Sequence, residues 1–236
     1  MASSHILYKH PDSASFDGQF DYRSIIGKML YLEKSTRPDI AYAVHQCARF
    51  ASDSKEEHGK AVKWLGRYLL ETRDKGMILK PGKQSFDVYV DADFCGNWKS
   101  DEADDPSTAR SRSGYVIMYA NIPISWASKM QTEVALSTTE AEYIALSTAL
   151  RECMPLMQLI KELQDHGFDI IEGKPKVHCR VFEDNSGALI MATEHKARPR
   201  AKHLNVKYHH FRDHVVRGEI SVHAIGTDLQ CADLLN

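Results

Sequence analysis

Apolar residues recur every three or four positions in the first third of the chain, which is the spacing of one buried helix face. This spacing predicts a helix over residues 22–35, a second over 39–51, and a third that starts at a capping box in residues 54–57 and ends before Gly76. Pro38 stands at the first turn of the second helix, where its missing N–H group does no harm. Residues 1–21 are polar and show no period. We therefore expect a polar tail over 1–21, followed by a small three-helix segment over 22–82.

The period changes after the turn at Pro81-Gly82, where alternating apolar positions replace the helical spacing. The elements predicted from there are, in order, a strand at 86–90, a hairpin of strands 113–120 and 122–128, a helix at 138–164, a strand at 177–183, helices at 187–193 and 205–217, a strand at 220–225 and a helical turn from 230 onward. A hairpin followed by alternating strands and helices indicates an α/β domain, with helices packed on a mixed sheet. We assign this domain to residues 83–236.

Composition narrows the classes of function. Hydrophobic residues make up 43% and charged residues 26% of the 236 residues, as is typical of a folded globular chain. The net charge of −2 argues against non-specific coating of nucleic acid, so any such binding needs a local basic patch. We find neither an apolar run long enough for a membrane span nor a secretory leader. The five cysteines form no Cys-x-x-Cys pair, which argues against a zinc ribbon and favours a reducing, intracellular compartment.

Acidic side chains stand at the ends of several predicted elements. Asp91 closes the strand at 86–90, where a buried carboxylate needs a partner or a metal. Asp93 lies two residues further on and would share a face with Asp91 if the strand continued. Turn chemistry after a strand is an equally simple interpretation of the pair.

Two glutamates open the predicted helix at 138–164, and they differ in their expected roles. Ser137 and Glu140 have capping-box spacing, which gives Glu140 a structural task. Glu142 shares a helix face with the apolar Leu146 and Leu150, so we expect it to point inward. A solvated acid stabilised by the helix N-terminus is the alternative for Glu142.

Two further acids lie in the second half of the domain. Asp184 directly follows the strand at 177–183, at the end where open α/β sheets place ligands, although helix capping is an alternative. Asp233 lies in the last helical turn, and the short stretch up to Asn236 predicts that this turn frays. Oxygen ligands without a Cys/His cluster suit Mg²⁺ or Mn²⁺. Two such ions about 4 Å apart would grip the oxygens of a phosphodiester.

Sequence motifs in a fixed order make the prediction more specific. They cover residues 90–93, 127–129, 136–146, 183–188, 202–209 and 232–235. These motifs resemble those of the ribonuclease H domain of copia-type LTR retrotransposon polyproteins. Residues 22–80 resemble the segment that connects the reverse transcriptase to that domain. On this resemblance, the chain is identified as a fragment or a remnant of such a polyprotein.

The resemblance implies a ribonuclease H-like fold, a five-stranded mixed sheet flanked by helices. It implies metal-dependent hydrolysis of the RNA strand of RNA–DNA hybrids, carried out by four acids that hold two Mg²⁺ (or Mn²⁺) ions: Asp91, Glu142, Asp184 and Asp233. The implied partners are the hybrid and the fingers and palm of the same polyprotein's reverse transcriptase, and the implied location is a cytoplasmic retrotransposon particle. We expect no DNA synthesis from the chain itself, because no paired-aspartate polymerase motif precedes the domain.

Basic residues that could contact phosphates gather in the run from 196 to 203. The expected substrate-binding residues are Lys129, Arg198, Arg200, Lys202 and His203. A solvated surface loop is the alternative for the run. Trp64, Trp98 and Trp126 are interpreted as core or loop anchors rather than as platforms for base stacking.

Three hypotheses remain open. The first is an endoribonuclease that cuts the RNA of RNA–DNA hybrids. The second is a catalytically silent module that binds hybrid or supports a reverse transcriptase. The third, weaker hypothesis is an exonuclease built on the same fold.

Overall fold

The computed structural model describes residues 7–9, 11–98, 100, 105, 107–168, 177–194 and 206–236. The chain divides into two compact units, Met1–Ile78 and Leu79–Asn236. The division falls slightly before the boundary expected at residue 82. Among the described residues, no helix has the length and apolar character needed to cross a membrane.

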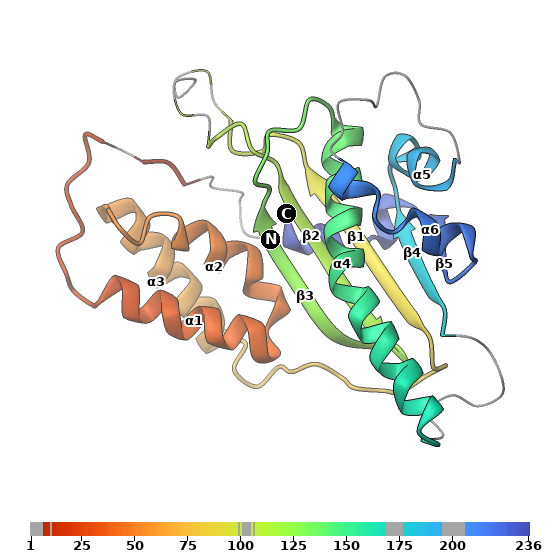
Figure 1. Cartoon of the computed structure of the whole chain (residues 1–236). Helices are drawn as coiled ribbons and strands as arrows, with labels where there is room; N and C mark the ends of the chain where they lie inside the picture. Colours follow the sequence, from red (N-terminus) through yellow and green to blue (C-terminus); the bar gives the residue numbers. More distant parts are fainter. Residues whose placement is uncertain are drawn as a thin grey trace. The chain divides into compact units, whose positions relative to one another are not determined.

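The first unit is helical, and its elements are α1 (Tyr22–Thr36), the 3₁₀ helix η1 (Pro38–Ile40), α2 (Ala41–Ala48) and α3 (Glu56–Glu71) (Figure 1). Asp21 caps α1, because its side chain accepts a hydrogen bond from the Ser24 N–H at 3.1 Å. Pro38 opens the short η1 rather than the expected longer helix. Trp64 is 63% exposed on α3, so the interpretation of this residue as a core anchor is wrong.

The second unit contains a five-stranded sheet in the order β3-β2-β1-β4-β5. Its strands are β1 (Phe86–Asp93), β2 (Arg112–Tyr119), β3 (Ile122–Met130), β4 (Cys179–Glu183) and β5 (Ile220–Ala224). Strands β1, β2 and β3 pair antiparallel, whereas β4 runs parallel to both β1 and β5. The expected five-stranded mixed sheet is confirmed. At the tip of the hairpin Ala120 and Asn121 both have positive φ, 50° and 63°, as a two-residue turn between twisted strands requires.

The long helix α4 (Thr138–Asp165) crosses one face of the sheet and covers the main core (Figure 1). The Ser137 Oγ accepts from the Glu140 N–H at 3.1 Å, and Glu140 accepts from the Leu136 N–H at 2.9 Å. The expected cap at this position is therefore present. The helix continues through Pro155.

The remaining helices of this unit are short. They are α5 (Ser186–Thr193), the 3₁₀ helix η4 (Val206–His209) and α6 (Arg212–Val216). The helix expected over 205–217 is thus divided into η4 and α6. Phe211, at the division, is fully buried in the core.

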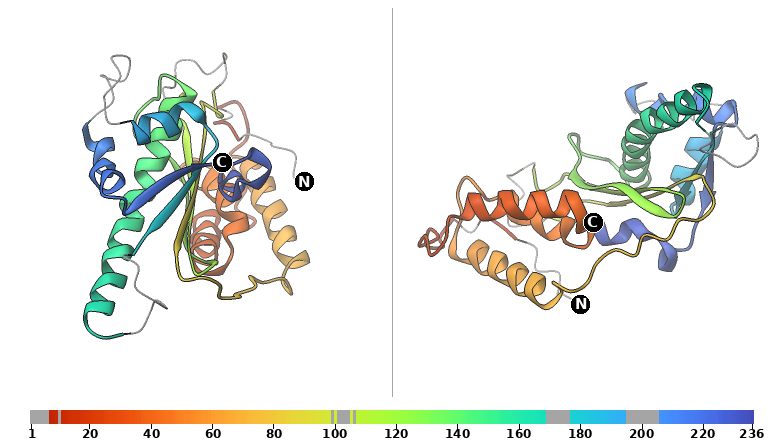
Figure 2. Two further views of the ribbon diagram at one scale, coloured as in Figure 1. Left: turned by 90° about the vertical axis from the view of Figure 1, so that its right-hand side faces the viewer. Right: turned by 90° about the horizontal axis from the view of Figure 1, so that it is seen from below.

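The chain ends in two 3₁₀ helices, η5 (Thr227–Leu229) and η6 (Cys231–Leu235). Neighbouring residues in a strand point to opposite faces, and in β2 Tyr115 belongs to the core under α4 while Gly114 faces η6. A Cβ atom on Gly114 would come within 2.8 Å of the Leu235 Cβ, so only glycine fits there. Helix η6 therefore packs on the face of the sheet opposite α4 (Figure 2). The fraying of this turn stays a prediction; in the structure Leu235 is buried against the sheet.

Candidate active site

Three of the four predicted acids lie together at one end of the sheet, where the neighbouring interior strands β1 and β4 finish. Asp91 comes from β1, Glu142 from α4, and Asp184 from the end of β4, and each offers a carboxylate oxygen within 4.8 Å of the others. The sheet register explains the pairing of the two aspartates, since β1 and β4 are parallel neighbours with Tyr89 opposite Phe182. Within the described part of the chain, this is the only cluster of three or more potential metal-binding His, Cys, Asp or Glu side chains.

Glu142 lies near the N-terminus of α4 with its side chain turned inward, as its helix face predicts, and it is only 6% exposed. Burial is the largest cause that raises its pKa, to about 10, and the nearby carboxylates of Glu183, Asp91 and Asp184 add to the effect. One of its oxygens, Oε2, is buried without a hydrogen-bond partner among the described residues. A carboxyl group held in this way either keeps its proton or requires a cation beside it.

Glu183 is a buried acid of the site that sequence reasoning missed. It is the last residue of β4, directly before Asp184, and is fully buried, and its Oε1 accepts a hydrogen bond from the Asn185 N–H at 3.0 Å. Burial raises its pKa to about 8, the Asn185 bond opposes the rise, and Asp184 and Asp91 increase it. The alternation of the strand could have predicted its burial, because Glu183 is two residues after the core residue Val181 and therefore points to the same face.

Two neutral donors hold the aspartates. The Asn236 Nδ2 donates to the Asp91 Oδ2 at 2.8 Å, and the Thr227 Oγ1 donates to the Asp184 Oδ2 at 3.0 Å. The pKa of Asp91 is still raised, because burial outweighs the Asn236 bond, and Asp184 and Asp233 add like charge. Both donors belong to the segment that follows β5, and neither was expected as a site residue.

Asp233 lies on η6, exposed, outside the cluster of three. It is close enough to raise the pKa of Asp91 electrostatically. Asp93 has a structural contact instead, because its Oδ1 accepts from the backbone N–H of Arg112, its partner in β2. Strand β1 thus continues through both aspartates, but Asp91 belongs to the acid cluster whereas Asp93 binds the backbone of β2.

The donor set fits a hard divalent cation. Its ligands are carboxylate oxygens, which Mg²⁺ and Mn²⁺ prefer. Like charges at this spacing repel one another, and the raised pKa values of Asp91 and Glu142 record that repulsion together with burial. A cation would remove the repulsion and would provide a partner for the buried Glu142 Oε2.

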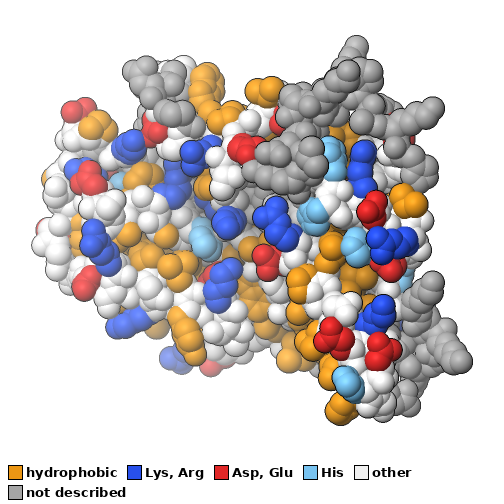
Figure 3. Space-filling model, in the orientation of Figure 1, with side chains coloured by type: hydrophobic (Ala, Val, Ile, Leu, Met, Phe, Trp, Pro, Cys, Tyr) orange, Lys and Arg blue, Asp and Glu red, His pale blue; other side chains and the backbone are white. Residues whose placement is uncertain are grey.

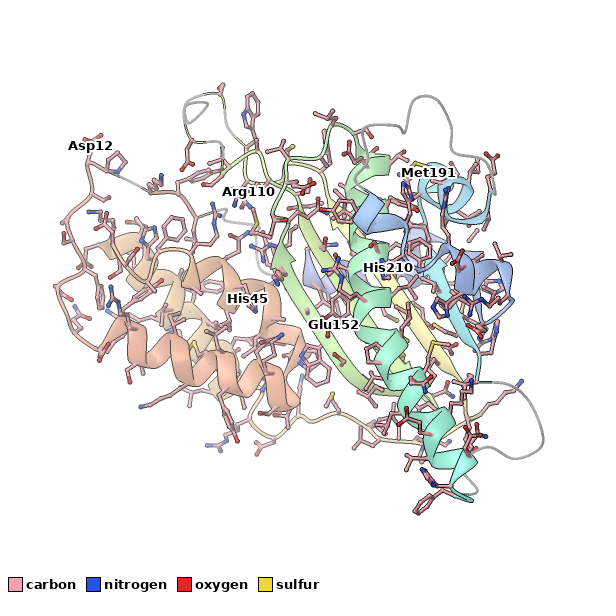
Figure 4. The ribbon with its side chains drawn as sticks, in the orientation of Figure 1. Asp12, His45, Arg110, Glu152, Met191 and His210 are labelled. Carbon is pink, nitrogen blue, oxygen red and sulfur yellow. The ribbon has the colours of Figure 1, made fainter. Side chains whose placement is uncertain are left out.

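The predicted substrate contacts are less well defined. Lys129 is exposed on the edge strand β3, opposite Ser113 of β2. Arg198, Arg200, Lys202 and His203 lie outside the described residues. Arg110 is exposed two residues before β2 begins (Figure 4). Figure 3 shows basic and acidic side chains interspersed over the visible face, in keeping with the net charge of −2.

The chain is similar in sequence to transposon proteins of plants. No family model matches it. The retrovirus-related Pol polyprotein from transposon TNT 1-94 of Nicotiana tabacum is 35% identical over 214 residues, which are 91% of this chain and 15% of that protein. The corresponding polyprotein from transposon RE1 of Arabidopsis thaliana is 37% identical over 216 residues, which are 91% of this chain and 14% of that protein.

The chain is a homologue of one segment of copia-type transposon Pol polyproteins. It spans about a seventh of the length of these curated relatives. Among solved structures, the ribonuclease H1 LC11, isolated from compost by a metagenomic approach, is 18% identical with a TM-score of 0.42. That match covers 64% of this chain and 92% of the ribonuclease.

Proposed function

We propose that this Pol segment is a ribonuclease H that hydrolyses the RNA strand of RNA–DNA hybrids during reverse transcription. The observation that carries the proposal is the convergence of Asp91, Glu142 and Asp184, from three separate elements, to within 4.8 Å of one another. The homology to transposon Pol polyproteins supports the same assignment.

The acids would share two Mg²⁺ or Mn²⁺ ions, with Asp91, Glu142 and Asp184 as the main ligands and Asp233 completing the second site. Bound divalent ions in such pairs lower the pKa of a water nucleophile and stabilise the departing oxygen. The chain's own groups hold the ligands in place. Asn236 and Thr227 orient the carboxylates of Asp91 and Asp184 through their hydrogen bonds.

The proposed substrate is recognised by its shape and its phosphates rather than by its base sequence. Lys129 and the basic run at 196–203 are the proposed phosphate contacts. The reverse transcriptase domain of the same polyprotein is the proposed partner, and a cytoplasmic retrotransposon particle is the proposed location. The homology to Pol polyproteins supports the proposed partner, and the net charge of −2 favours local contacts over broad electrostatic attraction.

Cleavage of a hybrid whose RNA strand is labelled tests the proposal. The full chain with Mg²⁺ should cut the RNA internally, and Asp91→Asn should lower the rate at least about a hundredfold while the circular dichroism stays unchanged. Asp228→Asn is a matched control, because Asp228 is an exposed aspartate on η5 outside the acid cluster. Undiminished cleavage by Asp91→Asn would overturn the assignment.

The other outcomes separate the remaining hypotheses. Hybrid binding by the full chain without cleavage would identify a silent binding module and overturn the proposed hydrolysis. Release of single nucleotides from one labelled end would identify an exonuclease and overturn the endonucleolytic assignment. A set of internal fragments supports the proposal.

A further inference from the structure

Three polar side chains meet near the start of β4, at the opposite end of this strand from Asp184. The His178 Nε2 lies 2.8 Å from the Ser221 Oγ, and the His223 Nε2 lies 2.7 Å from the same oxygen. Two imidazole nitrogens thus converge on a single hydroxyl group. His178 directly precedes β4, and Ser221 and His223 belong to β5.

The sheet register brings these residues together. Cys179 pairs with Ile220 in the parallel β4–β5 ladder, so His178 lies beside the start of β5. The backbone of His178 is fixed on its other side, because its carbonyl oxygen accepts from the Phe86 N–H at 3.4 Å. Ser221 and His223 are two residues apart in a strand and therefore point to the same face.

The orientation of His178 is fixed by a second contact. Its Nδ1 lies 3.0 Å from the backbone oxygen of Gly218, which can only accept a hydrogen bond. Nδ1 therefore donates to this oxygen, and Nε2 is the ring nitrogen that faces Ser221. A backbone carbonyl bound to Nδ1 in this way is the contact that commonly orients a metal-binding histidine. Gly218 has a φ of 71°, and this left-handed backbone conformation, two residues before β5 begins, positions the carbonyl.

We propose that His178 and His223, with Ser221 between them, bind a transition metal ion of the zinc, nickel and copper class. Imidazole nitrogens suit these ions, whereas Mg²⁺ prefers oxygen ligands. The ion would take the place of the hydroxyl hydrogen bonds, at about 2.1 Å from each Nε2. His223 is exposed and His178 and Ser221 are half-buried, so an ion can enter from solvent while water completes its coordination.

The electrostatic surroundings allow a cation. Arg180 is the nearest basic residue in the register, directly opposite Ser221. Its charge is balanced by a bidentate pair with Asp87, with both hydrogen bonds at 2.7 Å. The ring of Phe182 lies 5.9 Å from that of His223 and covers one side of the imidazole.

The two sites are distinct in position and chemistry. Six residues of extended chain separate His178 from Asp184, which corresponds to about 20 Å. A bound ion at the histidines would tie the residue before β4 to β5, which is an edge strand of the sheet. We therefore expect the ion to stabilise the pairing of β4 with β5 and to leave the acid cluster unchanged.

Titration of the untagged full chain with Zn²⁺ tests this proposal, in a buffer with excess Mg²⁺ to occupy the carboxylates. The measurements are calorimetry for stoichiometry and imidazole nitrogen NMR for the ligands. We expect one saturable Zn²⁺ per chain and large shifts of the Nε2 signals of His178 and His223. His223→Asn should weaken binding at least tenfold, whereas His166→Asn, at an exposed histidine beyond α4, should leave it unchanged.

Two further variants distinguish loss of the ligands from misfolding and from binding at the acids. Ser221→Ala keeps both imidazoles and should still bind, which gives a test independent of any misfolding of His223→Asn. Asp91→Asn should retain the His178 and His223 shifts, because the acid cluster is a separate site. The absence of saturable binding by the unmodified chain, or Zn²⁺ binding that His223→Asn leaves intact, would overturn the proposal.

Discussion

Replacement of Glu142 by glutamine tests the physical basis of the candidate active site, because it removes a buried charge while nearly preserving shape. In the folded chain the pKa of Glu142 is raised to about 10, from 4.5. A carboxyl group with a raised folded-state pKa holds its proton more tightly in the folded than in the unfolded state. Stability is then full below about pH 4.5 and is lost as the pH rises towards 10.

The size of the effect follows from the same shift. One pKa unit corresponds to about 1.4 kcal/mol, so a rise from about pH 5 to about pH 8 removes on the order of 4 kcal/mol of unfolding free energy when no cation is present. Glu183 adds to this loss between its ordinary pKa and about 8. Glu142→Gln should remove the share of the pH dependence that Glu142 contributes and leave the share of Glu183, whose raised pKa comes mainly from its own burial.

Urea unfolding in the presence of a chelator measures the unfolding free energy at each pH, with separate transitions fitted for the two units. We expect the unmodified chain to lose stability from about pH 5 to about pH 8, and we expect Glu142→Gln to be the more stable protein at about pH 8. Glu152→Gln is the control, because Glu152 is exposed on the same helix, beside β2 (Figure 4). If Glu142→Gln keeps the full pH dependence of the unmodified chain, the account of the site as crowded and desolvated is wrong.

Three further predictions concern the same domain. Calorimetry should show that Mg²⁺ raises the melting temperature of the unmodified chain at about pH 8 more than that of Asp91→Asn, since the ion binds only the folded acid cluster. Equal shifts of the two melting temperatures would contradict binding at the acid cluster. Asn236→Ala should lower hybrid cleavage roughly tenfold without unfolding, because a hydrogen bond to a charged carboxylate contributes about 1.5 kcal/mol or more; restoration by Asn236→Gln would support a positioning role, and an unchanged rate would exclude one. Leu146→Ala should destabilise the chain by about 2–5 kcal/mol in urea unfolding, whereas Leu136→Ala, at a residue that is 72% exposed, should change stability by less than about 0.5 kcal/mol; similar losses for both would contradict the assigned core.

Local sequence signals predict the elements whose structure depends on their own residues. The hairpin turn at Ala120-Asn121 and the Ser137 cap of α4 are examples, since short contacts along the chain determine both. The same local period suggested one helix over 205–217, and there tertiary contacts prevail. Tyr143 Oη lies 2.7 Å from the His209 Nδ1, so the last residue of η4 is bound to α4, and Phe211 between η4 and α6 is buried in the core.

A site residue could be predicted where its position in the apolar period of a helix or strand fixed the direction of its side chain. Glu142 is the clear case, because its helix face is otherwise apolar. Asn236 and Thr227 could not be predicted, since their roles depend on the segment after β5 reaching the ends of β1 and β4. For Trp64 the prediction was wrong, because it rested on the residue type alone. Val62 and Leu65 form the buried side of α3, and Trp64 lies on the exposed side.

The two proposed metal sites should load independently, and the reason lies in the chemistry of their donors. The acid cluster offers carboxylate oxygens, one from a residue that is only 6% exposed, and its occupancy depends on ionising groups that burial keeps protonated. The histidine site offers imidazole nitrogens, and the ring of His178 is already oriented by the Gly218 carbonyl. Mg²⁺ gains little from imidazole, so an excess of Mg²⁺ occupies the acids without displacing Zn²⁺ from the histidines. Strand β4 thus has the histidine site, with nitrogen ligands, at its start and the acid cluster, with oxygen ligands, at its end. Mutation can remove either site without altering the ligands of the other.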